Sequence, residues 1–485
     1  MSRRFCTAAV LAVSAALFVA SCSTTVQGTA VSVFDDPFKV AGMPAVDGPS
    51  GLRPGAKPPS REVENTDGGE IDELAAASVS DIEDFWEIAY PETFDDDGFI
   101  PVKQLVSWDA SGYESFGFCG HDTYGLENAG YCFPNRTIGW DRGRLLPDRR
   151  DRFGDLAVTQ VLAHEYGHAI QHLARLDDKN KSTLVSEQQS DCFAGAYMRW
   201  VAEGNSDRFT LSTGDGLNSL LAAVISFRDP VLSEDMFIPG ANDHGSAFER
   251  ITAFQFGFID GAASCARIDE KEVMQRRGDL PVALQQNQTG EWPVSEESVR
   301  AVFDALGQLF APADPPKLSL EAGSAQGCPD ARPSPPVSFC PATNTIAVDM
   351  AELEQLGMPS GQDINDNGGV VSGDNTAYSV LVSRYMLAVQ HDRGALVLDS
   401  AEAALRTACL TGVATTKMTD PITTADGNTV ALTAGDLDEA VSGLLTNGLA
   451  ASDVNGDTVP SGFSRMDAFR VGVLGDEERC FKRFP

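Results

Sequence analysis

The chain has 485 residues, of which 70 are acidic and 36 basic, so its formal net charge is -34. At about 100 to 200 residues per domain, this length predicts two or three folding units. So acidic a surface repels phosphate backbones and anionic headgroups, which argues against nucleic acid as a partner.

The N-terminus has the layout of a secretory signal peptide, predicted over residues 1–21. Two arginines precede an apolar run from Ala8 to Ala20, which is too short to span a membrane. The run ends Val-Ala-Ser before Cys22, and this junction resembles the lipobox of bacterial lipoproteins, whose cysteine becomes the acylated first residue. The resemblance implies a lipid on Cys22 and a location on the extracytoplasmic face of the cell membrane. The alternative is ordinary signal cleavage nearby, with Cys22 an incidental thiol.

The next segment is poor in large apolar residues. From Ser23 to about Asn65 it is mostly Ser, Thr, Gly, Pro and Ala, without a sustained period of 2 or 3.6, so we expect a flexible tether over residues 22–77. Regular structure is predicted from near Ser80, where a capped amphipathic helix begins. Short strands follow in the stretch that contains the first two cysteines of the mature chain.

A long apolar helix, predicted over about residues 155–174, contains a His-Glu-x-x-His motif formed by His164, Glu165 and His168. Residues four apart lie on nearly the same helix face, so both imidazoles can reach one ion, while Glu165 is left free to bind the ion's water. Zinc lowers the pKa of such a water to around 7, and a nearby carboxylate can take its proton as it attacks an amide carbonyl. The motif therefore indicates a catalytic zinc site; the alternative is two exposed histidines on an ordinary helix.

The following helix, predicted over about residues 183–202, supplies a candidate third ligand. The polar loop between the two helices is long enough for the chain to turn and run back, which lets Glu187 approach His164 and His168. Three protein ligands leave the fourth position open for water, as a catalytic site requires. Asp191, one turn later, is placed to accept the outer ring N–H of a ligand histidine.

Three pieces of sequence carry a family resemblance: HEYGHAIQ, EQQSDCFAGAY, and HGS followed by Arg250. Over about residues 80–265 they resemble the neutral zinc metallopeptidases of bacteria, and the Glu-x-x-x-Asp after the first motif looks like the gluzincin pattern of thermolysin-like peptidases. The resemblance implies an α+β, zincin-like and mainly helical peptidase domain with a small β element and one Zn²⁺ per chain. The roles it implies are zinc ligation by His164, His168 and Glu187, with Glu165 as general base. An alternative makes Asp191 the oxygen ligand and Glu187 a surface charge.

His244, in the sequence Asp-His-Gly-Ser, is a candidate donor to the developing oxyanion. The alternative is a histidine that only packs at the start of a helix. Tyr166, between the two ligand histidines, is another candidate for the donor role, although a tyrosine there also suits the core.

The second half of the chain echoes the first. Six sets of residues recur in the same order at slowly drifting offsets, 219 for the sets from Gly154 to His172 and 215 for the last set, which predicts a duplicated domain. The predicted division is a peptidase domain at 78–290 and a non-catalytic repeat at 291–485. The repeat lacks every metal and catalytic residue: Ser383, Arg384, Leu387, Ala404, Ala408 and Val459 stand at the positions of His164, Glu165, His168, Glu187, Asp191 and His244.

Removal of the signal peptide and lipidation of Cys22 leave eight cysteines, an even number in a chain that reaches an oxidising compartment. Each half has one closely spaced pair and one distant pair, so we expect pairing within each half. The predicted disulfides are Cys119–Cys132, Cys192–Cys265, Cys328–Cys340 and Cys409–Cys480.

Asp363 opens a stretch that fits a calcium-binding loop, but the duplication favours a Gly/Asn turn there. The sequence as a whole predicts a membrane-tethered zinc peptidase acting on a protein or peptide substrate. The alternative is a non-enzymatic envelope lipoprotein, stabilised by zinc, that acts as a binding or scaffold protein. Because structural zinc usually has four protein ligands, often cysteines, the three-ligand pattern favours the enzyme.

Overall fold

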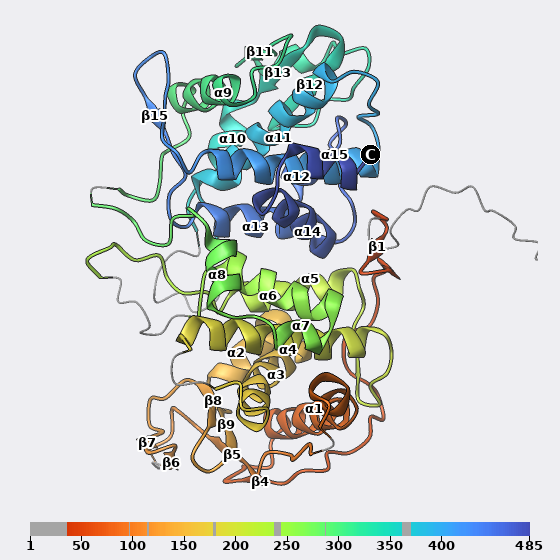
Figure 1. The fold of residues 1–485 in the computed structure, drawn as a ribbon, viewed down its shortest axis with the longest axis vertical. Helices are drawn as coiled ribbons and strands as arrows, with labels where there is room; N and C mark the ends of the chain where they lie inside the picture. The colour runs from red at the N-terminus through yellow and green to blue at the C-terminus, as the bar shows by residue number, and fades with distance from the viewer. Residues whose placement is uncertain are drawn as a thin grey trace, which may run out of the picture. The chain divides into compact units, whose positions relative to one another are not determined.

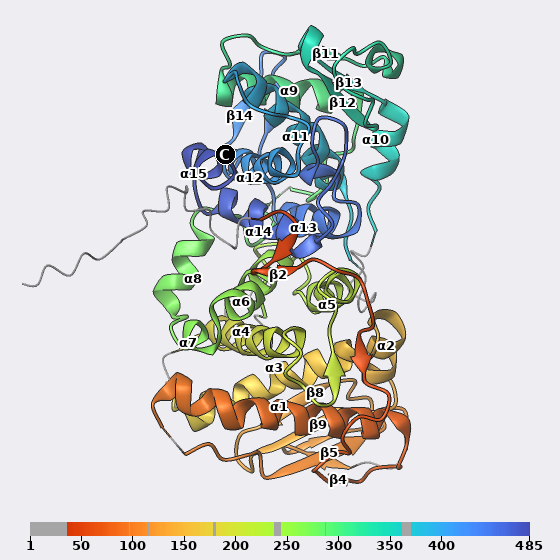
Figure 2. The same cartoon turned by 90° about the vertical axis from the view of Figure 1, so that its right-hand side faces the viewer.

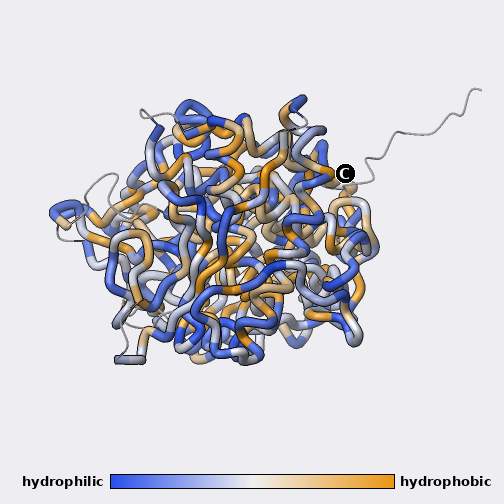
Figure 3. Tube along the Cα trace, turned by 90° about the horizontal axis from the view of Figure 1, so that it is seen from below, coloured by the Kyte–Doolittle hydropathy of each residue, from blue (hydrophilic) through white to orange (hydrophobic). Residues whose placement is uncertain are grey.

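The computed structural model describes residues 36–485 except 97, 114–115, 178–180, 237–243, 287 and 361–369. The predicted signal peptide, Cys22 and the loop that begins near Asp363 lie outside the described residues. Residues 33–485 group into one unit, with apolar residues gathered in its interior and hydrophilic ones along its periphery (Figure 3). Helices and strands are both present, as the predicted α+β class requires. Among the described helices, none has the length and apolar character needed to span a bilayer.

The first half contains a four-stranded sheet in the order β4-β5-β9-β8. β4, β5 and β9 run parallel, and β8 is antiparallel to β9. Helix α1 (Glu70–Phe94) lies along this sheet (Figure 2), where its Asp72 accepts hydrogen bonds from Trp140 Nε1 at 2.8 Å and Ser107 Oγ at 2.7 Å. The strands are β4 (Val63–Glu64), β5 (Gln104–Trp108), β8 (Ala129–Cys132) and β9 (Thr137–Asp141), with a small hairpin of β6 (Gly117–Phe118) and β7 (His121–Asp122).

The structure differs from the sequence expectation before α1. Residues 36–69 pack along the folded body, whereas composition assigns them to a tether, and α1 begins at Glu70 instead of near Ser80. β3 (Gly51–Leu52) pairs with β10 (Phe209–Thr210), and β1 (Lys39–Val40) pairs with β2 (Met43–Pro44). Backbone pairing of this kind leaves no hydrophobic period in the sequence, which is why composition does not reveal it.

Helices α2 to α8 complete the first half. α4 and α6 cross so closely that a Cβ on Gly257 would lie 1.7 Å from the Cys192 carbonyl oxygen, so only glycine permits this approach. The disulfide Cys192–Cys265 joins α4 to α7 at the same place. The bounds are α2 (Leu145–Phe153), α3 (Asp155–Leu173), α4 (Thr183–Ala202), α5 (Asp215–Ile225), α6 (Ala247–Asp260), α7 (Ala262–Cys265) and α8 (Glu270–Arg277).

The second half follows a similar order of elements (Figure 1). In its sheet β11 is parallel and β12 antiparallel to the central β13, as β5 and β8 are to β9. A Cβ on Gly472 would lie 1.8 Å from the Cys409 carbonyl oxygen, which repeats the close crossing of the first half. The strands are β11 (Lys317–Ser319), β12 (Val337–Cys340), β13 (Thr345–Val348), β14 (Ile422–Thr423) and β15 (Thr429–Val430). The helices are α9 (Glu296–Phe310), α10 (Met350–Leu356), α11 (Asp374–Asp392), α12 (Ala401–Lys417), α13 (Asp436–Thr446), α14 (Gly462–Val473) and α15 (Glu477–Arg483), with short 3-10 turns at Ala322–Ala325, Pro341–Thr343 and Leu449–Ala451.

The disulfides of the structure are the four pairs predicted from the sequence, Cys119–Cys132, Cys192–Cys265, Cys328–Cys340 and Cys409–Cys480. The two halves meet where α13 and α14 lie beside α5 and α6 (Figures 1 and 2). There Phe248 N donates to Asp438 Oδ1 at 3.2 Å, and Gly462 N donates to Asn218 Oδ1 at 3.0 Å. The helices that border the candidate site are therefore braced by the second half.

Candidate metal centre

Helices α3 and α4 run antiparallel and bring the predicted ligands together. His164 lies opposite Asp191, and His168 lies opposite Glu187. The helices approach closely at Gly167, where an added Cβ would lie 2.8 Å from the Ser190 Cα, and Ser190 Oγ donates to the His164 carbonyl oxygen. The glycine between the two histidines thus allows a residue on α4 to reach both.

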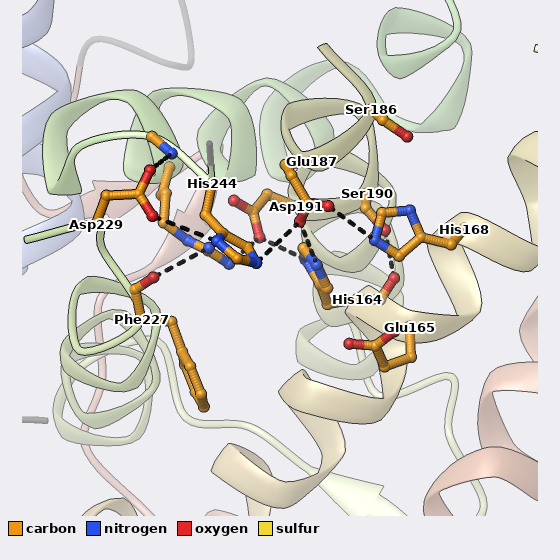
Figure 4. A network of polar contacts seen from close by, with 12 residues as sticks. His164, Glu165, His168, Ser186, Glu187, Ser190, Asp191, Phe227, Asp229 and His244 are labelled. Atoms are coloured by element: carbon orange, nitrogen blue, oxygen red, sulfur yellow. Dashed lines mark hydrogen bonds and ion pairs between the residues drawn. The ribbon is translucent and has the colours of Figure 1, made fainter. Parts of the chain in front are cut away.

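Three donor side chains converge in the close-up of Figure 4. His164 Nε2 lies 3.0 Å from Glu187 Oε2, and His168 Nε2 lies 3.4 Å from Glu187 Oε1. All three ligand atoms fall within 4.8 Å of one another, which is the spacing of ligands around a single ion. Glu187 is therefore placed with the two histidines, as predicted.

The outer nitrogens of both imidazoles are held by acceptors. His164 Nδ1 donates to Asp191 Oδ1 at 2.8 Å, and His168 Nδ1 donates to Gln171 Oε1 at 3.1 Å. With a hydrogen on each Nδ1, the Nε2 lone pairs of both rings are available to a metal ion beside the carboxylate of Glu187. This orientation of the two rings is the one that histidine ligands of a metal ion usually have.

The electrostatics of these groups point the same way. Burial lowers the pKa of His164, but the carboxylates of Asp191 and Glu187 outweigh this effect and raise the pKa to about 10. Burial raises the pKa of Glu187, and the two histidines hold it well below its usual range. Two imidazoles and one carboxylate that favour positive charge are a donor set typical of Zn²⁺ in catalytic sites, so the residues present fit this ion.

Asp191 occupies the outer side of His164, away from the ligand atoms. It is fully buried and also accepts a hydrogen bond from Arg250 Nη2 at 2.8 Å, so a guanidinium balances its charge. This placement suits a residue that orients His164 and does not suit the alternative in which Asp191 replaces Glu187 as the ligand. Arg250 belongs to a recognised motif, but its pairing with Asp191 was not predicted, since no local pattern connects the two residues.

Glu165 lies on the other side of His164, at the wall of a cavity of about 450 Å³. Its Oε2 accepts a hydrogen bond from Tyr131 N at 3.0 Å, so the edge strand β8 fixes the carboxylate. The cavity is open to a substrate beside both the candidate base and the ligand His164. Its walls comprise Glu127, Asn128, Ala129, Arg144, Leu145, Asp148, Arg149, Gln160, Val161, His164, Glu165, Val224, Ser226, Phe227, His244 and Arg250.

His244 reaches the same cavity from the segment before α6. Its Nε2 is 3.9 Å from Glu187 Oε2, and its Nδ1 donates to Asp229 Oδ1 at 3.3 Å. The hydrogen bond to Asp229 raises the pKa of His244. Asp229 was missed by sequence reasoning because it lies in a loop without a motif, and only the fold brings it to His244.

Tyr166 does not take part. It is buried against α1, where its hydroxyl donates to Glu83 Oε1 at 3.1 Å and accepts from Val102 N at 3.3 Å. The alternative that Tyr166 donates to the oxyanion is therefore wrong, because its ring points to the opposite side of α3.

Comparison with known proteins identifies the same region of the chain. Residues 57–268 match the model of a family described as "Putative neutral zinc metallopeptidase", so the predicted family resemblance is confirmed for this segment. Two curated relatives, both named "Uncharacterized protein YpfJ", from Escherichia coli K12 and Escherichia coli O6:H1, are each 29% identical to this chain over 150 residues. The alignment covers 27% of this chain and 50% of each relative, so the chain spans about half the length of the curated relatives it matches. No solved structure matches.

Proposed function

Since residues 57–268 match the neutral zinc metallopeptidase family, we propose that the protein is a gluzincin-like zinc peptidase that hydrolyses peptide bonds of a protein or peptide substrate. The observation that carries the proposal is the convergence of His164, His168 and Glu187 at an open cavity that also contains Glu165. Zinc held by these three residues would lower the pKa of a water molecule and polarise the scissile carbonyl.

Glu165 is the general base in this proposal. Its carboxylate faces the cavity and is held by the backbone amide of Tyr131, so it is oriented before substrate arrives. It takes a proton from the attacking water and delivers that proton to the leaving amine, which returns the carboxylate to its starting state.

His244 supports the developing oxyanion. Asp229 accepts from Nδ1, which leaves Nε2 directed toward the ligand group, and the raised pKa of His244 favours a protonated, donating Nε2. A preoriented donor of this kind stabilises charge that appears only in the transition state.

The proposal includes a duplicated, zincin-like architecture in which the second half is a degenerate copy. The matched order of elements, the matched strand pairing and the matched positions of the disulfides support it. Arg384, at the position of Glu165, is fully buried, and its guanidinium donates to Val337 O at 2.8 Å and Ser452 Oγ at 2.8 Å. The residue at the position of Glu165 therefore makes interior contacts of the second half.

The cellular placement rests on the N-terminal sequence. A cleaved signal peptide over residues 1–21 and a lipid on Cys22 would hold the protein on the extracytoplasmic face of the cell membrane. Four disulfides support an oxidising compartment.

The second candidate function is a binding or scaffold lipoprotein whose zinc only stabilises the fold. The two are separated by comparing wild type with Glu165→Gln, which keeps the size of the side chain and the three ligands. The peptidase proposal expects one zinc per chain in both proteins by metal analysis, with cleavage of a peptide library by wild type alone. Equal cleavage by both proteins, or none by either, would contradict it.

A further inference from the structure

A second cavity, of about 360 Å³, lies next to the candidate active site. We call it the side groove; it is lined by residues 229–232, 236, 245–246, 248–249 and 276–277 and 280–282 of the first half and by 433–435 and 437–438 of the second. We propose that the side groove binds an apolar side chain of an extended polypeptide substrate, about three residues from the scissile bond. This inference rests on the proposed peptidase function and names a substrate preference for it.

The side groove shares a wall with the active site. Asp229 lines the groove, and its carboxylate holds His244 by the 3.3 Å contact to Nδ1 and Gly245 by a 2.8 Å hydrogen bond from its backbone amide (Figure 4). On the opposite side of its ring, His244 Nε2 is 3.9 Å from Glu187 Oε2. The groove is therefore separated from the ligand Glu187 by the His244 ring and its contacts on either side. About three residues of an extended chain, at roughly 3.3 Å each, span this distance.

The surface of the groove is more apolar than polar. Val231, Met236 and Val282, which line it, are 41%, 59% and 45% exposed. They are three of the fourteen large apolar side chains exposed among the described residues, and all three line this one cavity. Apolar side chains that line a concave site, with a few polar groups beside them, are typical of a ligand pocket.

The charged groups of the groove are already engaged. Arg277 Nε pairs with Glu249 Oε1 at 2.7 Å, and Asp438 Oδ1 accepts from Phe248 N at 3.2 Å. Since a ligand does not have to neutralise them, the apolar side chains decide what binds. A cavity of this volume accommodates about one or two side chains, whereas a protein interface buries about 800 Å² per partner, so a segment of substrate fits it better than a second folded protein.

The second half supplies one wall of the groove. Ala434 and Leu437 at the start of α13 line it, and a Cβ on Gly435 would lie 3.2 Å from Val231 Cγ2. The degenerate copy would thus take part in substrate selection although it lacks the metal ligands.

The test uses the full-length protein and a peptide digest of casein. The variant Val231→Asp/Val282→Asp places two carboxylates in the groove at exposed positions, and Val397→Asp, at a residue 59% exposed outside the groove, is the matched control. Wild type and control are expected to cleave preferentially where an apolar residue stands about three positions from the scissile bond, and the double variant is expected to lose that preference by roughly tenfold, the value of one buried apolar side chain. An unchanged preference in the double variant, or cleavage by wild type without this preference, would overturn the proposed role of the groove.

Retention of the same peptides on immobilised Glu165→Gln protein, with and without the groove substitutions, separates the two proposals. Retention of apolar peptides that the groove substitutions abolish supports the groove even where Glu165-dependent cleavage is absent, in which case the peptidase function alone fails. Equal retention by both proteins overturns the groove. Thermal unfolding checks that the variants are folded, and a change of molecular mass in solution caused by the groove substitutions would assign the surface to self-association and also overturn the proposal.

Discussion

Replacement of Asp191 by Asn tests whether the site is organised for a metal. The substitution keeps an oxygen that can accept from His164 Nδ1 but removes the charge that pairs with Arg250. Mutation of such an outer partner typically costs 10 to 100-fold in metal affinity, so zinc should bind with about 1.4 to 2.7 kcal/mol less free energy. The metal-free protein should also lose up to about 3 to 5 kcal/mol of stability, because Arg250 is 5% exposed and would be left as a buried, unpaired charge.

Chelator competition measures the zinc affinity, and chemical denaturation of the metal-free protein measures the stability. The double variant Asp191→Asn/Arg250→Gln should regain part of the stability, since the unpaired guanidinium is gone, but none of the zinc affinity. Asp229→Asn is the matched control: this acid lies near the site but contacts His244 and Gly245 instead of a ligand, so zinc affinity should not change. Wild-type zinc affinity in Asp191→Asn, or restored affinity in the double variant, would refute the proposed role of Asp191.

Three further predictions concern the donor, the buried acids and the disulfide. His244→Gln should lower kcat roughly 100 to 1000-fold, the usual cost of an oxyanion donor, and leave the zinc content at one per chain by metal analysis. Burial, together with the neighbouring carboxylates, raises the pKa of Glu439 to about 10, and burial raises the pKa of Asp374 to about 7. The folded protein therefore binds more protons than the unfolded chain, so the stability that these acids contribute below about pH 4 should be lost as the pH rises through 7 to 10. Glu439→Gln should flatten this slope in a pH series of unfolding curves. Replacing Cys192 and Cys265 by Ala should destabilise the protein by about 4 kcal/mol in denaturant titrations, because the bridge closes a loop of 73 residues.

The sequence was sufficient to predict those parts of the site that depend on helix periodicity. The four-residue spacing of His164 and His168 and the return of the next helix placed Glu187 correctly, because both follow from local geometry. Glycine at 167 sets the helix contact on which that placement relies. The cysteine spacings predicted the disulfide pairing, because each half of the chain has one closely spaced pair and one distant pair.

The remaining parts of the fold and site depend on contacts between distant segments. Asp229 is joined to His244 by a loop conformation, and Arg250 meets Asp191 only after α4 and α6 have packed. The segment 36–69 is held by backbone pairing such as that of β3 with β10, which small and polar residues can provide without an apolar period. None of these contacts leaves a periodic signal in one chain.

The second half bears on why the first half retains its ligands. Under the proposed duplication, Ser383 and Leu387 stand where His164 and His168 stand, and α12 still has the disulfide to α15 and the close glycine contact with α14. Leu387 and Ala404 are fully buried, so apolar contacts in the copy replace what an ion and its donors would contribute. This arrangement of helices can therefore form with apolar residues at the positions of the donors. Burying two imidazoles and a carboxylate carries a desolvation cost that apolar residues avoid, and their presence in the first half is therefore better explained by chemistry than by structural support.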